Sequence, residues 1–231
     1  MFDKFFKKSA AAAPNGADST VNATHTQSRW VVLDTETTGL SLWRDRLISI
    51  AAVAIHVEPE LRSARIRMAD SFEAVIKPPE VTRAKVIRFN NKRSKENILI
   101  HHIGVHAQTV GEDQAAALER FKTWIGSAPL FAFHAPFDQS MVNKAYKKVS
   151  LTTPQNPWID VALLANWVAR DALHLSLDDR MKQFGLQCMS RHQAAGDTLV
   201  TAEMLLKMLP ALRRKVSDVD GLAHLARDQI A

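Results

Sequence analysis

Strand-like segments precede helix-like segments along this chain, and that order narrows the folds it can adopt. Apolar or alternating segments at residues 30–34, 47–55 and 64–77 follow one another with no helical pattern between them. Helical patterns begin near residue 115, and two short strand patterns, at 130–134 and 158–159, are interleaved with them. This order favours an α/β fold, with helices packed against a mixed five-stranded sheet, over a strictly alternating parallel fold.

The expected helices are bounded by residues that commonly start or stop helices. Asp160 is placed to cap one helix, and Ser176 begins a capping box for another. We expect the last of these helices, which is also the longest, to be interrupted by Pro210. The expected helices cover residues 115–125, the segment that Pro136 opens, 161–170, the segment ending at Gly185, and 194–208.

The composition is that of a soluble globular protein. Of the 231 residues, 46% are hydrophobic and 23% are charged. No uninterrupted apolar run reaches the roughly 20 residues that a membrane-spanning helix needs. The single cysteine, Cys188, excludes an internal disulfide framework and a cysteine-rich zinc site. We therefore expect a cytoplasmic protein with no membrane contact.

Two terminal segments flank the expected folded domain. Residues 1–28 combine a basic, phenylalanine-bearing start with a stretch rich in Ala, Ser, Thr and Asn, which is typical of a flexible linker. The start could be a short docking peptide or a frayed end. Residues 29–208 form the expected domain, and residues 209–231 form a helical tail that either docks a partner or packs on the domain.

A basic segment at residues 83–95 carries the whole formal net charge of the chain. It contains six lysines and arginines and no acid, and the net charge of the full chain is also +6. A local basic loop on a neutral body is a plausible contact for a polyanion such as nucleic acid. The alternative is a solvated surface loop that keeps the protein soluble.

Two carboxylates stand at the end of the first expected strand. The apolar run 30–33 leads directly into Asp34-Thr35-Glu36, and side chains alternate along a strand, so Asp34 and Glu36 point to the same side. Carboxylates this close repel one another unless a cation lies between them, which indicates a divalent-metal site. Taken alone, the pattern also fits a strand followed by an ordinary polar turn.

Three further residues share this chemistry. Asp138 follows a buried strand and lies in the first turn of a helix, where it could also serve to stabilise the helix dipole. Asp197 lies in the opening turns of another helix, five residues after His192. A histidine in that position suits a general base that takes a proton from a water molecule. The alternative is a surface histidine followed by an acidic helix start.

Together these residues describe one coherent site. Carboxylate ligands suit Mg²⁺ or Mn²⁺ rather than zinc. Four carboxylates can hold two such ions about 3.5–4 Å apart, an arrangement that supports in-line displacement at phosphorus. We therefore group Asp34, Glu36, Asp138 and Asp197 as metal ligands, with His192 as their catalytic companion.

The order Asp-x-Glu-Thr-Thr-Gly, then Phe-Asp, then His-x₄-Asp resembles the DEDDh 3′→5′ exonucleases, a family typified by the proofreading ε subunit of bacterial DNA polymerase III. The resemblance covers about residues 29–208. It implies a ribonuclease H-like fold, two Mg²⁺ or Mn²⁺ ions, and removal of nucleoside monophosphates from a 3′ end. It also implies that Asp34 bridges the two ions.

The same resemblance implies which residues contact the substrate. Backbone groups of the turn after Glu36 would hold the terminal nucleotide, and apolar and histidine side chains would lie between the last bases. The substrate-binding positions implied are Thr37, Thr38, Gly39, Leu40, Ile100, His101 and Phe137.

Two positions depart from the family pattern. His134 stands where the family commonly has an amide, before the alanine that precedes Asp138. His102 replaces a glycine in the family's Ile-His-Gly-Ile, next to the basic segment. An alternative for this second region is zinc binding by His101, His102 and His106, although no fourth ligand is evident.

Three functional hypotheses follow. The first is a DNA 3′→5′ exonuclease acting on single-stranded or frayed ends, in proofreading or repair, with a polymerase or another replication protein as an optional partner. The second keeps the chemistry but takes RNA as substrate, because the sequence does not show the contacts that read a 2′-hydroxyl. The third is a non-catalytic nucleic-acid-binding accessory module of a polymerase.

Overall fold

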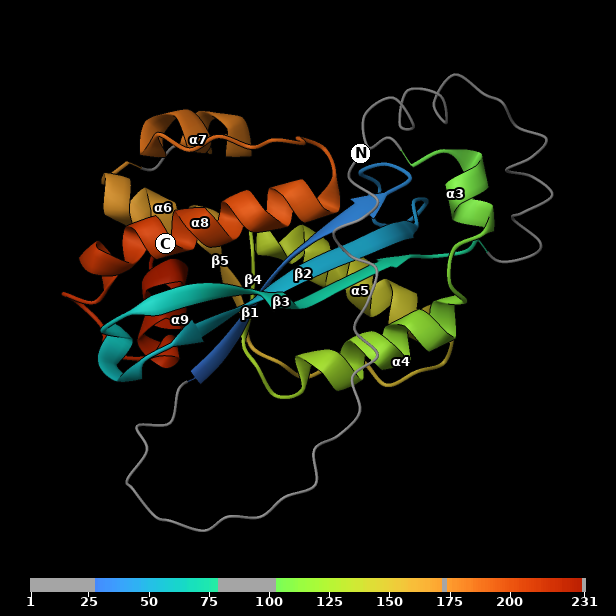
Figure 1. Cartoon of the computed structure of the whole chain (residues 1–231), viewed down its shortest axis with the longest axis horizontal. Helices are drawn as coiled ribbons and strands as arrows, with labels where there is room; N and C mark the ends of the chain where they lie inside the picture. The colour runs from blue at the N-terminus through green and yellow to red at the C-terminus, as the bar shows by residue number, and fades with distance from the viewer. Residues whose placement is uncertain (1–27, 79–102, 172–173, 230–231) are drawn as a thin grey trace, which may run out of the picture.

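The computed structural model describes residues 28–78, 103–171 and 174–229 (Figure 1). The expected linker, the basic segment 83–95 and most of the histidine-rich region after it lie outside these residues. Within the described ranges, no helix is long and apolar enough to cross a membrane.

The sheet is mixed and five-stranded, as predicted. Its order is β3-β2-β1-β4-β5. The first three strands pair in antiparallel fashion, whereas β4 and β5 run parallel to β1. The strands are β1 (Ser28–Thr37), β2 (Leu47–Val57), β3 (Ala64–Val75), β4 (Leu130–Ala132) and β5 (Trp158–Asp160).

The helices begin at the capping residues that the sequence indicated. The carboxylate of Asp160 accepts from the backbone N–H of Ala162 at 2.9 Å, and the Ser176 hydroxyl accepts from that of Asp179 at 3.2 Å. The helices are α3 (Val105–Thr109), α4 (Gln114–Ile125), α5 (Ala135–Lys148), α6 (Val161–Ala169), α7 (Leu177–Phe184), α8 (Ala194–Leu212) and α9 (Val219–Arg227), with a short 3₁₀ turn at Pro59–Leu61.

Helix α8 corrects one expectation. It does not end at Met208 but continues through Pro210 to Leu212. A proline removes one backbone hydrogen bond from a helix. Leu209 and Leu212 are both buried in the core, and this packing holds the last turn in place despite the missing bond.

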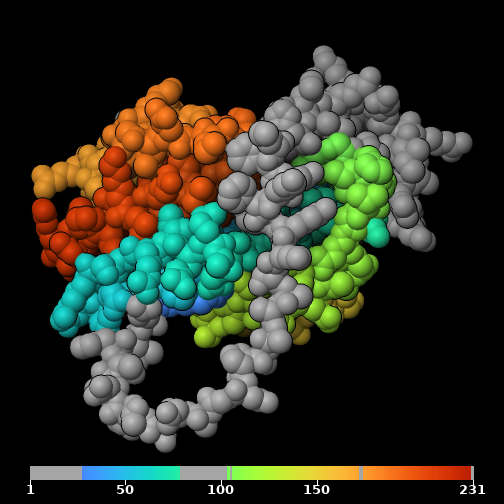
Figure 2. All heavy atoms as spheres, viewed as in Figure 1, coloured from blue at the N-terminus to red at the C-terminus, as the bar shows by residue number. Residues whose placement is uncertain are grey.

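Helices cover both faces of the sheet (Figure 1). On one face, Trp30 and Val32 of β1 belong to a core shared with α6, α8 and α9. On the other face, Val31 and Leu33 pack with α4 and α5. Figure 2 shows the orange and red surface of α7 and α8 on one side of the teal surface of β3 and the green surface of α4 on the other.

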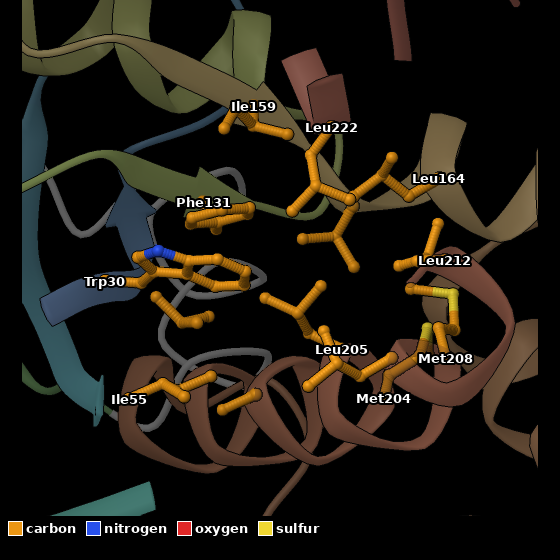
Figure 3. Packing of buried hydrophobic residues seen from close by; sticks show 14 of the residues in the cluster. Trp30, Ile55, Phe131, Ile159, Leu164, Met204, Leu205, Met208, Leu212 and Leu222 are labelled. Carbon is orange, nitrogen blue, oxygen red and sulfur yellow. The ribbon is translucent and has the colours of Figure 1, made fainter. Parts of the chain in front are cut away.

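The tail after residue 208 packs on the domain. Leu222 of α9 is buried in the same core as Leu164 and Leu212 (Figure 3). At the centre of this core the rings of Trp30 and Phe131 stack with their centroids 4.9 Å apart. Helix α9 thereby covers α6 and β5 and completes the apolar layer behind the sheet.

Candidate active site

The two acidic side chains of β1 lie on the face of the sheet that α8 covers. They alternate with Thr35, which points to the α5 face, just as Val32 alternates with Leu33 earlier in the strand. The β1–β2 register shifts between Glu36 and Thr37, directly after the second carboxylate. This bulge ends the regular pairing, so that the chain turns away at the edge of the sheet.

Asp138 approaches from the other layer. It lies in the first turn of α5, which follows β4, the parallel neighbour of β1. Its side chain is only 4% exposed, and the Thr35 hydroxyl donates to its Oδ1 at 2.6 Å. The backbone N–H of Thr35 also donates to this carboxylate. Thr35 therefore ties Asp138 to the strand that carries Asp34 and Glu36, a role the sequence analysis missed.

Asp197 is held at the start of α8 by the loop that carries His192. The backbone N–H of His192 donates to Asp197 Oδ2 at 3.2 Å. The guanidinium of Arg191 pairs with Asp197 and also donates from Nε to Asp178 Oδ1 at 2.6 Å. The His192 side chain is exposed. The sequence analysis assigned no role to Arg191, because one arginine beside a histidine forms no recognisable motif.

The four carboxylates repel one another. Burial, with the charges of the other three, raises the pKa of Asp34 well above its usual value. Burial, followed by the charges of Asp197 and Asp138, raises the pKa of Glu36 to about 8. Burial raises that of Asp138 to about 7, although the hydrogen bonds from Thr35 act in the opposite direction. Among the described residues, Arg191 is the cation that pairs with one of these carboxylates, Asp197.

This donor set fits a divalent cation in its chemistry. All four candidate ligands are carboxylates, which suit Mg²⁺ or Mn²⁺. The hydroxyl of Ser49, which pairs with Glu36 across β1 and β2, is buried and has no hydrogen-bond partner among the described residues. Within the same residues, no three acidic, histidine or cysteine side chains already surround a single point as ligands. Arg191 and Thr35 instead engage the carboxylates of α8 and α5.

Comparison with known proteins identifies the chain. The sequence profile of a family described as "Exonuclease" matches residues 31–205, which is most of the chain. The chain belongs to the exonuclease family. It is 30% identical over 201 residues to the PolC-type DNA polymerase III of Bacillus subtilis, covering 84% of this chain. It spans only 12% of the length of that relative.

Solved exonuclease structures share the fold. The zinc-ion-bound form of the Escherichia coli exonuclease I–single-stranded DNA complex matches with a TM-score of 0.62 and 19% identity, over 82% of this chain and 42% of that one. Exonuclease X in complex with 5′-overhanging duplex DNA matches with a TM-score of 0.60 and 18% identity, over 85% of this chain and 99% of that one. Both likenesses confirm the predicted ribonuclease H-like architecture.

The turn after the β1 carboxylates is well ordered by its own hydrogen bonds. The Thr37 hydroxyl donates to the carbonyl of Gly39 at 2.8 Å, and the backbone N–H of Thr38 donates to the carbonyl of Arg46 at 3.0 Å. Gly39 has a φ of 151°, which favours glycine. Leu40 is 83% exposed. A rigid turn with a projecting leucine is suited to hold the end of a substrate.

Of the other predicted substrate positions, Phe137 lies among the described residues, whereas Ile100 and His101 do not. Phe137 lies in the first turn of α5, half-buried, next to Asp138. Ile100, His101 and His102 lie outside the described residues, so the predicted contacts of Ile100 and His101 stay predictions. The zinc alternative likewise stays untested, with His106 alone placed, in α3.

His134 fits its position in this exonuclease fold because of its backbone conformation. It precedes α5 with φ 60° and ψ 48°, in the left-handed region that asparagine and histidine adopt more readily than most residues. Its backbone N–H donates to Asp160 Oδ1 at 3.1 Å. The replacement of the family's amide therefore preserves the turn that presents Asp138.

Gly196 allows the His192 loop to lie against α8, and Gly196→Ala tests this contact. An added Cβ would collide with the backbone carbonyl oxygen of Ser190 and approach Cys188 Sγ at 3.3 Å. Alanine normally stabilises a helix interior relative to glycine. Here we expect a loss of about 1–3 kcal/mol in the free energy of unfolding, measured by denaturant melts, together with reduced nuclease activity.

Gly104→Ala is the matched control for Gly196→Ala. A Cβ at Gly104 would meet no atom within 4 Å, and its backbone conformation suits any residue. We expect this variant to melt close to the wild type. Equal stability of the two variants would show that the Ser190 contact does not constrain the loop.

Proposed function

We propose that this chain is a metal-dependent 3′→5′ exonuclease that hydrolyses single-stranded or frayed DNA ends to nucleoside 5′-monophosphates. One observation carries the proposal. Four carboxylates from three separate elements, β1, α5 and α8, meet at one edge of the sheet with raised pKa values at Asp34, Glu36 and Asp138. A fold tolerates such a cluster when a cation completes it.

The ligand set would hold two Mg²⁺ or Mn²⁺ ions. Asp34, Glu36, Asp138 and Asp197 would hold them through their carboxylate oxygens. When bound, the ions supply a nucleophile at neutral pH and neutralise charge at the leaving oxygen. Thr35 orients Asp138, and Arg191 orients Asp197, so the protein fixes two of the four ligands before any ion arrives.

His192 would act as the general base. Its side chain is exposed, and its backbone N–H donates a hydrogen bond to Asp197 Oδ2 at 3.2 Å. From this place it would accept the proton of the attacking water. The turn at Thr37–Leu40 would hold the 3′-terminal nucleotide, with Leu40 against its base and Phe137 beside the next.

DNA is the favoured substrate, and a polymerase is the favoured partner. The similarity to a PolC-type DNA polymerase III and the DNA bound to two structural relatives support both choices. The chain would then act in proofreading or repair, in the cytoplasm.

Digestion of matched DNA and RNA oligonucleotides tests this function. With a 5′ label and Mg²⁺ or Mn²⁺, we expect a ladder of DNA products that shorten from the 3′ end, and no products in EDTA. A 3′ label should be released at once as a mononucleotide. A preference for RNA would replace DNA by RNA as the substrate, and release of the 5′ label first would reverse the direction. Absence of any product with metal present would favour a binding module.

A further inference from the structure

Apart from the candidate active site, a cavity lies where the β1–β2 loop meets α5. It is formed in part by the segment that follows the Thr37–Leu40 turn. Its volume is about 340 Å³. Buried Met141 and Ala145 of α5 contribute apolar lining. The polar and aromatic side chains around it are Trp43, Arg44, Arg46, Gln114, Lys144 and Lys148.

The lining is strongly cationic. Four of the side chains are lysine or arginine, and the one acid, Asp45, accepts hydrogen bonds from the Thr38 hydroxyl at 2.9 Å and the Ser41 backbone N–H at 2.9 Å. None of the four cations forms an ion pair with another described residue. An anionic ligand would compensate the positive charge of these side chains.

The electrostatics of individual groups agree with this. Burial lowers the pKa of Arg46 to about 10. Burial and the neighbouring charges of Arg46 and Lys144 lower the pKa of Lys148. Burial thus disfavours the charge of Arg46, and at Lys148 the repulsion from neighbouring cations adds to burial.

Two of the cations are already fixed in place. Lys144 Nζ donates to the carbonyls of Leu42, Trp43 and Asp45 at 2.8, 3.0 and 2.6 Å. The Arg46 guanidinium donates to Gln108 Oε1 at 2.5 Å. The side chains of Arg44 and Lys148 make no hydrogen bond with the described residues. Lys144 and Arg46 are thus held in place beside the cavity, whereas the side chains of Arg44 and Lys148 are able to reorient toward a ligand.

An exposed aromatic ring stands beside these charges. Trp43 is 92% exposed, which is unusual for a large apolar side chain. Aromatic faces next to cations are the common means by which proteins hold nucleotides, because the ring stacks on a base while the cations take the phosphate.

We propose that this cavity is a second nucleotide site, in which Arg46 and Lys148 bind a phosphate, the charge of Lys144 adds to its attraction, and Trp43 stacks on the attached base. The phosphate could belong to an internal nucleotide of the bound strand or to a free nucleoside 5′-monophosphate. The first source rests on the proposed function, because it requires that the chain bind nucleic acid.

Binding of a fluorescent single-stranded oligonucleotide in EDTA tests the site without hydrolysis. Lys148→Ala should weaken binding about 3- to 10-fold and reduce the slope of log K against log salt by about 0.7, the loss of one phosphate contact. Lys147→Ala is the matched control, because Lys147 is a neighbouring exposed lysine on the same helix that does not line the cavity. We expect its slope to equal that of the wild type.

Trp43 provides a second, independent readout. Trp43→Ala should weaken binding about 5- to 100-fold, the range for loss of one stacked base, whereas Trp43→Phe should retain most of the affinity. Competition with an unlabelled deoxynucleoside 5′-monophosphate separates the two sources. If it displaces the oligonucleotide from the wild type and not from Lys148→Ala, the site takes free nucleotide. If it has no effect, the site takes the strand.

Equal salt slopes for the Lys147 and Lys148 variants, or a neutral Trp43→Ala, would overturn the inference. The result is distinguishable from failure of the proposed function. Metal-dependent hydrolysis together with equal salt slopes for the Lys147 and Lys148 variants would exclude the second site but not the proposed function. Different salt slopes for these two variants, in a protein that hydrolyses nothing, would support the second site and exclude the nuclease assignment.

Discussion

Asp34→Asn is expected to abolish hydrolysis and, at the same time, to raise the melting temperature of the metal-free protein. The asparagine keeps the shape of the side chain but removes a charge that would help to hold the ions. We expect activity to fall by about 10³-fold or more, since a central ligand and its electrostatic contribution are lost together.

The gain in stability has a separate cause. Burial, followed by the charges of the other three carboxylates, raises the pKa of Asp34, so the folded protein disfavours its ionised form and a neutral isostere relieves both effects. We expect a rise of about 3–8 °C at pH 8 in EDTA, corresponding to about 1–2 kcal/mol in a chain of this size. Thermal melts with and without metal measure it.

Asp70→Asn is the matched control for Asp34→Asn. Asp70 lies on β3 of the same sheet, but it accepts hydrogen bonds from Arg29 Nε at 2.7 Å and Nη2 at 2.8 Å, and this pairing lowers its pKa. Its replacement should lower the melting temperature and leave activity intact. If Asp34→Asn also lowered the melting temperature of the metal-free protein, the carboxylate cluster would not be under electrostatic strain.

The metal-free protein should lose stability as the pH rises from about 5 to 8. Glu36 has its pKa raised from 4.5 to about 8 in the folded state. Across this interval the folded protein therefore holds a proton that the unfolded chain has released. A folded state that binds more protons becomes less stable as the pH rises. We expect a loss of about 1–3 kcal/mol, reduced by the partial exposure of Glu36.

Divalent metal should reverse this loss. Mn²⁺ or Mg²⁺ binds the ionised carboxylates, so its stabilisation should be larger at pH 8 than at pH 5 and should reach about 2.7 kcal/mol at a hundredfold excess over the dissociation constant. Melting curves at both pH values, in EDTA and in metal, provide the measurement. Glu36→Gln should flatten the pH dependence. An equal effect of metal at both pH values would argue against carboxylate ligation.

Much of this fold could be predicted because its signals are local. Strand segments appear as short apolar runs, and side chains such as Asp160 cap helices within three residues of themselves. Of the helix features, the end of α8 was predicted wrongly and the packing of the tail was left open, and both depend on distant contacts. Helix α8 passes Pro210 because Leu209 and Leu212 are buried in the core, and α9 docks because Leu222 meets side chains from α6 and α8.

The candidate site also has a part that could be predicted from local sequence and a part that could not. Its carboxylates occur in short motifs, and the structure gathers them at one edge of the sheet. The residues that orient them were not predictable. Thr35 reaches Asp138 only because α5, rather than α8, covers its face of the sheet, and Arg191 reaches Asp197 and Asp178 through the fold of one loop. Such partners are set by layer packing, which a linear motif does not encode.

Lys144 joins two parts of the site that would otherwise be independent. One ammonium group clamps three carbonyls of the β1–β2 loop, and it lies on α5 only six residues beyond Asp138. Lys144 therefore ties the loop that would grip the end of a strand to the helix that would supply the metal ligand Asp138. Under the proposed function, the distance between the bound 3′ terminus and the bond to be cleaved would be fixed by this contact. Each turnover would then advance the strand rather than change the conformation of the enzyme.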